Sequence, residues 1–160
     1  MNERPTTPAD FIAHLAKVTG TIGTMELGPA LEDRLNRDFP AGGAWFDAAV
    51  DLCRRGCAEG WLCGREAGAV KFGRAAPAGD ATHGMSIDVV TMDDVVGPHH
   101  SHPNGEIDLV MPLDDGAQFD GRAAGWKVYA AGSAHRPTVS VGKALVLYLL
   151  PGGAIEFTRA

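Results

Sequence analysis

The distribution of glycine and proline divides this sequence at Trp61 and limits what it can fold into. Before Trp61, apolar residues recur at helical spacing, whereas after it glycine and proline return at short intervals. The segments between them are short and rich in strand-forming residues, as in a sandwich or barrel. No long helical pattern interrupts this half, which argues against parallel strand–helix–strand units. We therefore predict a helical N-terminal extension, residues 1–60, packed on an antiparallel β-barrel, residues 61–160.

Three helices are expected in the extension. The first follows Thr7, a good N-cap residue, and its apolar pattern ends at Gly20. The second begins at Pro29, and the third spans about 44–58 with a broad apolar stripe. The candidate strands of the barrel are residues 61–65, 69–74, 84–92, 106–112, 126–130, 137–141, 144–150 and 154–158.

Composition excludes several classes of partner. A length of 160 residues with 45% hydrophobic residues suits one globular domain, and no apolar run approaches the roughly 20 residues that span a bilayer. The net charge of −6 leaves no basic face for nucleic acid. Three cysteines cannot all pair, and with no signal-peptide pattern this predicts a cytoplasmic protein. Cys53 and Cys57 lie on the apolar stripe of the third helix, which favours buried small side chains over a metal pair.

The densest chemical signal is the segment 97–106, Gly-Pro-His-His-Ser-His-Pro-Asn-Gly-Glu. If His100 and His102 lie on a strand, the two-residue period places both rings on one face. Pro-Asn-Gly then turns the chain, so that Glu106 can direct its carboxylate at those rings. Two imidazoles and one carboxylate suit Zn, Fe, Mn or Ni, whereas the alternative is a histidine-rich surface turn. His135 is the leading candidate for a fourth ligand.

His100-x-His102-x3-Glu106 resembles the first metal-binding motif of the cupins, and Gly132-x2-His135 resembles the core of the second. The resemblance covers roughly residues 61–160. It implies a mainly β, cupin-type antiparallel jelly-roll barrel in which His100, His102, Glu106 and His135 bind one divalent metal ion. The sequence departs from the family pattern at Asp94, Gly116, Ala130 and Val139. These departures weaken the second motif, and therefore His135, more than the first.

A narrower resemblance covers both motifs and the helical extension. The strings Gly-Pro-His-His-Ser-His-Pro-Asn-Gly-Glu-Ile-Asp and Gly-Ser-Ala-His-Arg-Pro-Thr are similar to those of the small 4-hydroxylaminobenzoate lyases. That resemblance implies conversion of 4-hydroxylaminobenzoate to 3,4-dihydroxybenzoate with loss of ammonia. Cupins commonly pair through sheet edges, so a homodimer is expected.

Two residues near the motif are candidates for moving protons. Asp108 shares strand parity with Glu106 and should face the same interior, although a solvent-facing aspartate on an edge strand is the alternative. His99 should turn away from His100, which favours a supporting or surface role over ligation. With Glu106, these residues form the candidate catalytic set.

Four further residues are candidates for contact with an aromatic acid. Arg74 or Arg136 could bind its carboxylate in a two-pronged fashion, although each alone is more often a surface residue. Trp126 and Tyr129 could stack on its ring, although core packing is the stronger expectation.

Two other functions remain open at this stage. The same barrel could house an Fe(II) dioxygenase or an isomerase acting on another small aromatic or keto acid. It could also be a sensor or storage domain in which the metal only stabilises the fold. Neither the metal nor the oligomeric state follows from the sequence.

Overall fold

The computed structural model describes residues 4–158, so the ends of the two predicted segments lie outside it. Within these residues, three α-helices precede the strands: α1 (Pro8–Ile22), α2 (Pro29–Asp38) and α3 (Ala44–Glu59). Thr7 caps α1, since its Oγ1 accepts a hydrogen bond from the Asp10 backbone at 3.2 Å. The predicted helices are thus confirmed, with α1 running past Gly20. None of the helices described is long and apolar enough to cross a membrane.

The remainder of residues 4–158 is built mainly of strands. In chain order these are β1 (Arg65–Ala67), β2 (Val70–Ala76), β3 (Met85–Val96), β4 (His100–His102), β5 (Glu106–Pro112), β6 (Gln118–Phe119), β7 (Gly125–Tyr129), β8 (Ser133–His135), β9 (Thr138–Pro151) and β10 (Glu156–Phe157), with a short 3₁₀ helix η1 (Asp80–Thr82) before β3.

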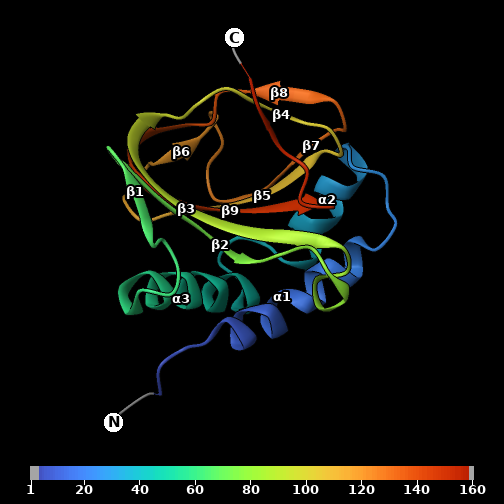
Figure 1. Ribbon diagram of the computed structural model, residues 1–160, viewed down its shortest axis with the longest axis horizontal. Coiled ribbons are helices and arrows are strands. Elements are labelled where there is room, and N and C mark those ends of the chain that lie inside the picture. The colour runs from blue at the N-terminus through green and yellow to red at the C-terminus, as the bar shows by residue number, and fades with distance from the viewer. Residues whose placement is uncertain (1–3, 159–160) are drawn as a thin grey trace.

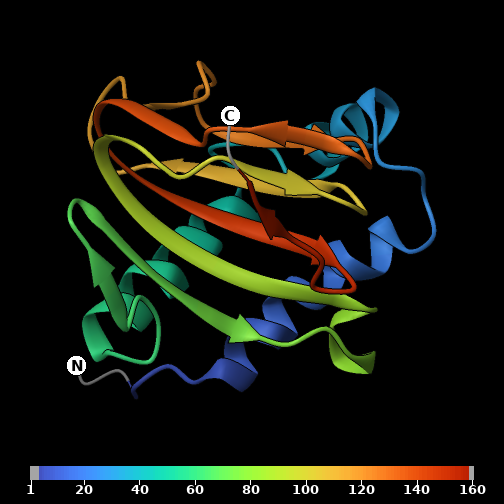
Figure 2. The same cartoon turned by 45° about the horizontal axis from the view of Figure 1, so that its top comes forward.

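The strands form two antiparallel sheets that face each other (Figures 1 and 2). The larger sheet has the order β1-β2-β3-β9-β5-β7, with β6 paired to β9, and the smaller has the order β10-β4-β8. The helices lie against the outer face of the larger sheet (Figure 1). The predicted fold, a mainly β, antiparallel cupin-type barrel with an N-terminal helical extension, is confirmed.

Strand alternation separates two environments on the larger sheet. Ile107 and Leu109 of β5 face the helices and belong to the same hydrophobic cluster as Phe11 of α1. Val110, the next residue of β5 and on its opposite face, packs inside the barrel with Tyr148 of β9. The helices therefore bury one face of the sheet, and the other face is left for the site.

Several strands differ from the prediction. Segments 137–141 and 144–150 form one continuous strand, β9, which has positive φ angles at Val141 (63°) and Gly142 (118°). Most of 61–65 is irregular, and β4, β6 and β8 are too short for a periodic pattern to reveal. The last two strands do not pair with each other, because the chain crosses after β9 to the smaller sheet, where β10 pairs with β4.

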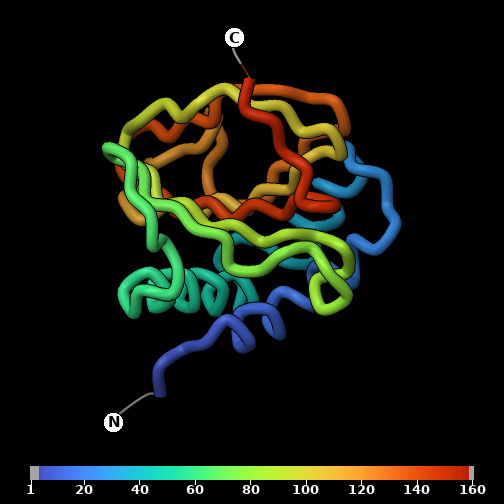
Figure 3. Tube along the Cα trace, in the orientation of Figure 1, coloured from blue at the N-terminus to red at the C-terminus, as the bar shows by residue number. Residues whose placement is uncertain are grey.

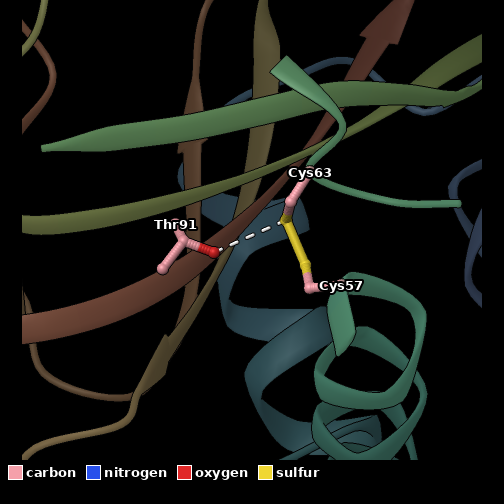
Figure 4. The surroundings of a disulfide bond; sticks show 3 residues. All are labelled: Cys57, Cys63 and Thr91. Atoms are coloured by element: carbon pink, nitrogen blue, oxygen red, sulfur yellow. Dashed lines mark hydrogen bonds between the residues drawn. A yellow bond between two sulfur atoms is a disulfide. The ribbon is translucent and has the colours of Figure 1, made fainter. Parts of the chain in front are cut away.

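The cysteines also require a correction. Cys57 near the end of α3 forms a disulfide with Cys63, with their Cα atoms 5.1 Å apart (Figure 4). The Cys63 Sγ lies 3.5 Å from the Thr91 hydroxyl of β3. Cys53 is buried and unpaired, as expected, and burial raises the pKa of its thiol. The prediction of buried free thiols therefore holds for Cys53 and is wrong for Cys57.

Candidate metal centre

The turn between β4 and β5 carries the chain from the smaller sheet to the larger. His100 and His102 are buried and lie on the same face of β4. At Gly105 (φ 87°) the backbone N–H donates to the His102 carbonyl at 3.1 Å. A Cβ there would lie 2.7 Å from the Tyr129 carbonyl oxygen, so only glycine fits without displacement. Glu106 then begins β5 directly opposite the two rings.

The four predicted ligands converge inside the barrel. His100, His102, Glu106 and His135 each offer one ligand atom, and these atoms all lie within 4.8 Å of one another. The two Glu106 oxygens lie 3.4 Å from the His100 Nε2 and 3.1 Å from the His102 Nε2. The His135 Nε2 lies 3.4 Å from Glu106 and 3.2 Å from the His100 Nε2. Strand pairing explains this, because His135 of β8 stands opposite His100 of β4.

The other ring nitrogens face outward. The His102 Nδ1 lies 3.0 Å from the Ser133 hydroxyl, and the His100 Nδ1 lies 3.4 Å from the Pro98 carbonyl oxygen. The His135 Nδ1 lies 2.6 Å from the Asp120 carboxylate. Partners of this kind fix the orientation of an imidazole, so all three present Nε2 to the common centre.

Asp120 is a residue that the sequence did not reveal. Its carboxylate accepts hydrogen bonds from the Tyr129 hydroxyl and, at 2.9 Å, from the Thr138 backbone as well as contacting His135. Burial would raise the pKa of Asp120, but the bonds from His135 and Tyr129 lower it below its ordinary value. Asp120 sits at φ 50° after the short strand β6, in no motif that could have marked it.

Charge is unevenly distributed over the centre. Burial alone would raise the pKa of Glu106, yet the three imidazoles that lie 3.1 to 3.4 Å from its oxygens hold it well below the ordinary value. Burial would lower the pKa of His135, but Asp120 and Glu106 raise it to about 9. The centre therefore holds an ionised carboxylate beside the His135 ring, whose pKa is raised.

The donor set fits a divalent metal ion. The His102 Nε2 and both Glu106 oxygens are buried without a hydrogen-bond partner, which is costly unless another group satisfies them. Three imidazole nitrogens and a carboxylate are ligands that Zn, Fe, Mn and Ni accept, and each ring has a partner on its far side. The geometry thus supports the predicted ligand set and leaves the identity of the metal open.

Asp108 lies next along the inner face of β5. It is completely buried, and neither carboxylate oxygen has a hydrogen-bond partner. Burial, followed by the charge of Glu106, raises the pKa of Asp108 well above its ordinary value. By register it stands between Tyr148 of β9 and Lys127 of β7. The alternative of a solvent-facing aspartate is therefore wrong.

The remaining candidates are spread over the barrel. Tyr129 reaches the centre, with its ring centroid 4.5 Å from that of His135. Arg74 is exposed and binds Asp88 through two hydrogen bonds of 3.0 and 3.3 Å, and Arg136 is exposed one residue after His135. His99 points away from the centre, with its Nδ1 2.6 Å from the Thr158 hydroxyl.

Trp126 lies on the wrong face of β7 for contact with substrate. It is buried in the core between the sheet and the helices, where its indole N–H donates to the Phe39 carbonyl at 3.0 Å. Its ring packs against Trp45 with centroids 5.7 Å apart. Core packing, the stronger expectation for Trp126, is thus confirmed, and the candidate role in substrate stacking is wrong, because strand alternation turns Trp126 away from the side that Tyr129 and Asp108 share.

Known proteins resemble this chain over nearly its whole length. It is 30% identical to a 4-hydroxylaminobenzoate lyase of Nocardioides sp. (strain LMS-CY), covering 94% of this chain and 95% of that protein. It is 31% identical to a 4-hydroxylaminobenzoate lyase of Pseudomonas putida, covering 98% and 97% respectively.

Solved structures with a similar fold are more distant. A crystal structure of an RmlC-like cupin protein from Ralstonia eutropha JMP134 is 13% identical, covers 57% of this chain and 60% of that one, and has a TM-score of 0.43. The DMSP lyase DddQ from Ruegeria pomeroyi DSS-3 is 17% identical, covers 96% and 98%, and also has a TM-score of 0.43. The model of the PnbB family, 4-hydroxylaminobenzoate lyase, matches residues 13–157. Taken with the two relatives, this match shows that the chain belongs to the 4-hydroxylaminobenzoate lyase family.

Proposed function

We propose that this protein is a metal-dependent lyase that converts 4-hydroxylaminobenzoate to 3,4-dihydroxybenzoate. The reaction consumes one water and releases ammonia, since the N–O bond breaks and the ring gains two hydroxyl groups. The observation that carries the proposal is the convergence of three imidazoles and Glu106 within 4.8 Å, in a chain whose relatives are named as lyases of this substrate.

His100, His102, Glu106 and His135 would hold the metal ion. A divalent ion supplies Lewis acidity that weakens an N–O bond and lowers the pKa of water. The protein contributes the orientation of the rings and apolar walls that exclude competing water, such as Val110 and Val146. Fixing the ligands in advance keeps the cost of reorganisation low.

Asp108 is our candidate for moving a proton. Departing ammonia needs a proton on nitrogen, and the Asp108 carboxyl lies on the inner face of β5, two residues from Glu106. Asp108→Asn keeps the shape but removes the exchangeable acid, so kcat should fall about 100-fold or more while metal content stays constant. An unchanged kcat would remove Asp108 from the mechanism. His99 points away from the centre, so its predicted proton role has no geometric support.

The substrate carboxylate needs a cation, and Arg74 is the better placed of the two candidates. Arg74 stands opposite Asp88 in the strand register, and Asp88 in turn stands opposite Tyr148, on the inner side of the sheet. Binding a carboxylate there requires Arg74 to share its donors with Asp88. Arg74→Gln should raise KM for the acid, and Arg136→Gln is the matched comparison.

The deciding experiment measures ammonia and 3,4-dihydroxybenzoate released by metal-loaded protein, with and without oxygen. Release that continues without oxygen supports a lyase, whereas strict dependence on oxygen would indicate a dioxygenase. Elemental analysis of the wild type, His100→Ala and His135→Ala should show metal in the first and loss in the variants. Folded, metal-loaded protein that releases no ammonia contradicts the proposal.

A further inference from the structure

We propose that Phe157 of β10 is the side chain on which the aromatic ring of the substrate packs. The inference rests on the proposed function, because it takes the substrate to be an aromatic acid. To a site otherwise built from metal ligands and acidic residues, it adds a residue that determines substrate specificity.

Strand pairing directs Phe157 to the same side as the metal ligands. In the register of β10 and β4, Phe157 stands opposite His100, and residues that are directly opposite share a face of the sheet. The two ring centroids are 5.8 Å apart with an interplanar angle of 66°. Phe157 therefore lies beside the ligand group but is not part of it.

Phe157 is far more exposed than the metal-ligand candidate that it stands opposite. Its side chain is 69% exposed, whereas the neighbouring His100 is 3% exposed. Among the described residues, the other exposed large hydrophobic side chains are Val96 and Val141. An aromatic face that is open to solvent and borders a polar centre is suited to bind an aromatic ring, because burial and ring–ring contact then act together.

The backbone holds Phe157 in this position before any ligand binds. After β9 the chain crosses from the larger sheet to the smaller at the front of the barrel (Figure 3), turning at Gly152 (φ 65°) and Gly153 (φ 70°). Beyond Phe157, the Thr158 N–H donates to the His99 carbonyl at 3.0 Å, and their side chains meet at 2.6 Å. His99 thus acts as a positioning residue for β10, and a side chain held in advance binds at lower entropic cost.

The test compares the binding of benzoate and cyclohexanecarboxylate to metal-loaded protein by calorimetry. These acids share charge and approximate size, so the ratio of their dissociation constants reports recognition of the aromatic ring. The wild type should prefer benzoate, and Phe157→Leu should reduce this preference by a factor between about 2 and 12, as expected for one aromatic contact. Phe157→Tyr should retain the preference, and KM for 4-hydroxylaminobenzoate should rise in Phe157→Leu with kcat little changed.

Val141→Ala is the matched control, since Val141 is 64% exposed and lies near Gly116. Val141→Ala should leave the preference for benzoate unchanged. Thr158→Val should lower that preference in part, because it removes the side-chain contact between Thr158 and His99 that holds β10. An undiminished preference in Phe157→Leu, or wild-type protein that binds neither acid, overturns the inference. A change in the mass of the assembly in Phe157→Ala also overturns it, by assigning the side chain to contact between two copies. Because the binding comparison needs no turnover, absence of ammonia release would refute the proposed reaction and leave this result interpretable.

Discussion

At the scale of the single residue, Asp120 connects the ligand group to the rest of the barrel. It contacts His135, accepts from Tyr129 and is fixed to the backbone of β9 through Thr138. Carboxylates in this position set the tautomer of a ligand histidine and increase its basicity. The affinity for metal should therefore depend on a residue that does not touch the ion.

Asp120→Asn tests this dependence. The amide keeps the shape but removes the negative charge, so metal affinity should fall about 10- to 100-fold with little effect on folding. Competition with a metal-sensitive chelator measures the change. Asp115→Asn, in an exposed loop, serves as the control. Equal affinities for Asp120→Asn and the wild type would show that His135 needs no orienting partner.

The sequence revealed the candidate metal ligands more readily than the residues that surround and orient them. His100, His102 and Glu106 stand within one short segment, where strand period and a turn define their geometry. Asp120 and Phe157 reach the same centre through β6 and β10, two strands of two residues each. Such strands carry no periodicity, and their partners are set by packing of the whole barrel.

At the scale of the element, the turn at Gly105 places Glu106 beside the imidazoles of the candidate metal centre. Gly105→Ala would place a Cβ 2.5 Å from Leu27 and force an alanine to adopt φ 87°. We expect a loss of about 1 to 3 kcal/mol in unfolding free energy, together with weaker metal binding. Urea unfolding and elemental analysis of the same preparation measure both. Gly121→Ala, with positive φ but open space around it, separates backbone strain from the steric clash.

Glu32 of α2 links the helical extension to the larger sheet through hydrogen bonds. Its Oε1 accepts from the Val128 backbone at 2.9 Å, and its Oε2 accepts from Arg122 at 2.6 Å. Burial would raise the pKa of Glu32, but these bonds and the nearby cations hold it below 4.5. A lowered folded-state pKa stabilises the protein above the unfolded value, and this contribution is lost as pH falls below it.

Glu32→Gln should therefore cost about 1 kcal/mol in unfolding free energy at neutral pH, since Arg122 is partly exposed. The difference from wild type should shrink as pH falls below 4.5 toward the lowered folded-state pKa of Glu32, where the wild-type carboxylate takes up its proton. Denaturant titrations at several pH values provide the measurement. Glu26→Gln, at an exposed position, should show no such trend, and a constant difference for Glu32→Gln would contradict the assignment.

Local patterns predicted the helices well and the crossings of the chain poorly. Thr7, Pro29 and Gly60 mark helix ends by rules that act within a few residues. The pairing of β10 with β4 joins segments more than fifty residues apart, and Pro151-Gly152-Gly153 alone suits a hairpin as well as a crossing. The choice depends on which sheet has an open edge.

At the scale of the whole molecule, the ligand group joins the two sheets. His100, His102 and His135 belong to the smaller sheet, and Glu106 belongs to the larger. A metal ion bound by all four would link the sheets and stabilise the folded state in proportion to the logarithm of its concentration over Kd.

Removal of the metal should accordingly lower the melting temperature. At a metal concentration about 1,000 times Kd, binding stabilises the folded state by about 4 kcal/mol, which raises the melting temperature by about 8 to 16 °C for a protein of this size. Differential scanning calorimetry with and without chelator measures the shift, and readdition of metal should restore it. His135→Ala should respond less to chelator, and an equal response would place the metal elsewhere.

The concentration of acids inside the barrel has a consequence for the order of binding. Burial raises the pKa of both Asp108 and Asp88, and the negative charge of Glu106 raises both further, so the interior disfavours an added negative charge. An incoming aromatic carboxylate would be disfavoured in the same way until a cation offsets its charge. We therefore expect ordered binding, in which the metal ion binds before the substrate and the apoprotein does not bind the organic acid.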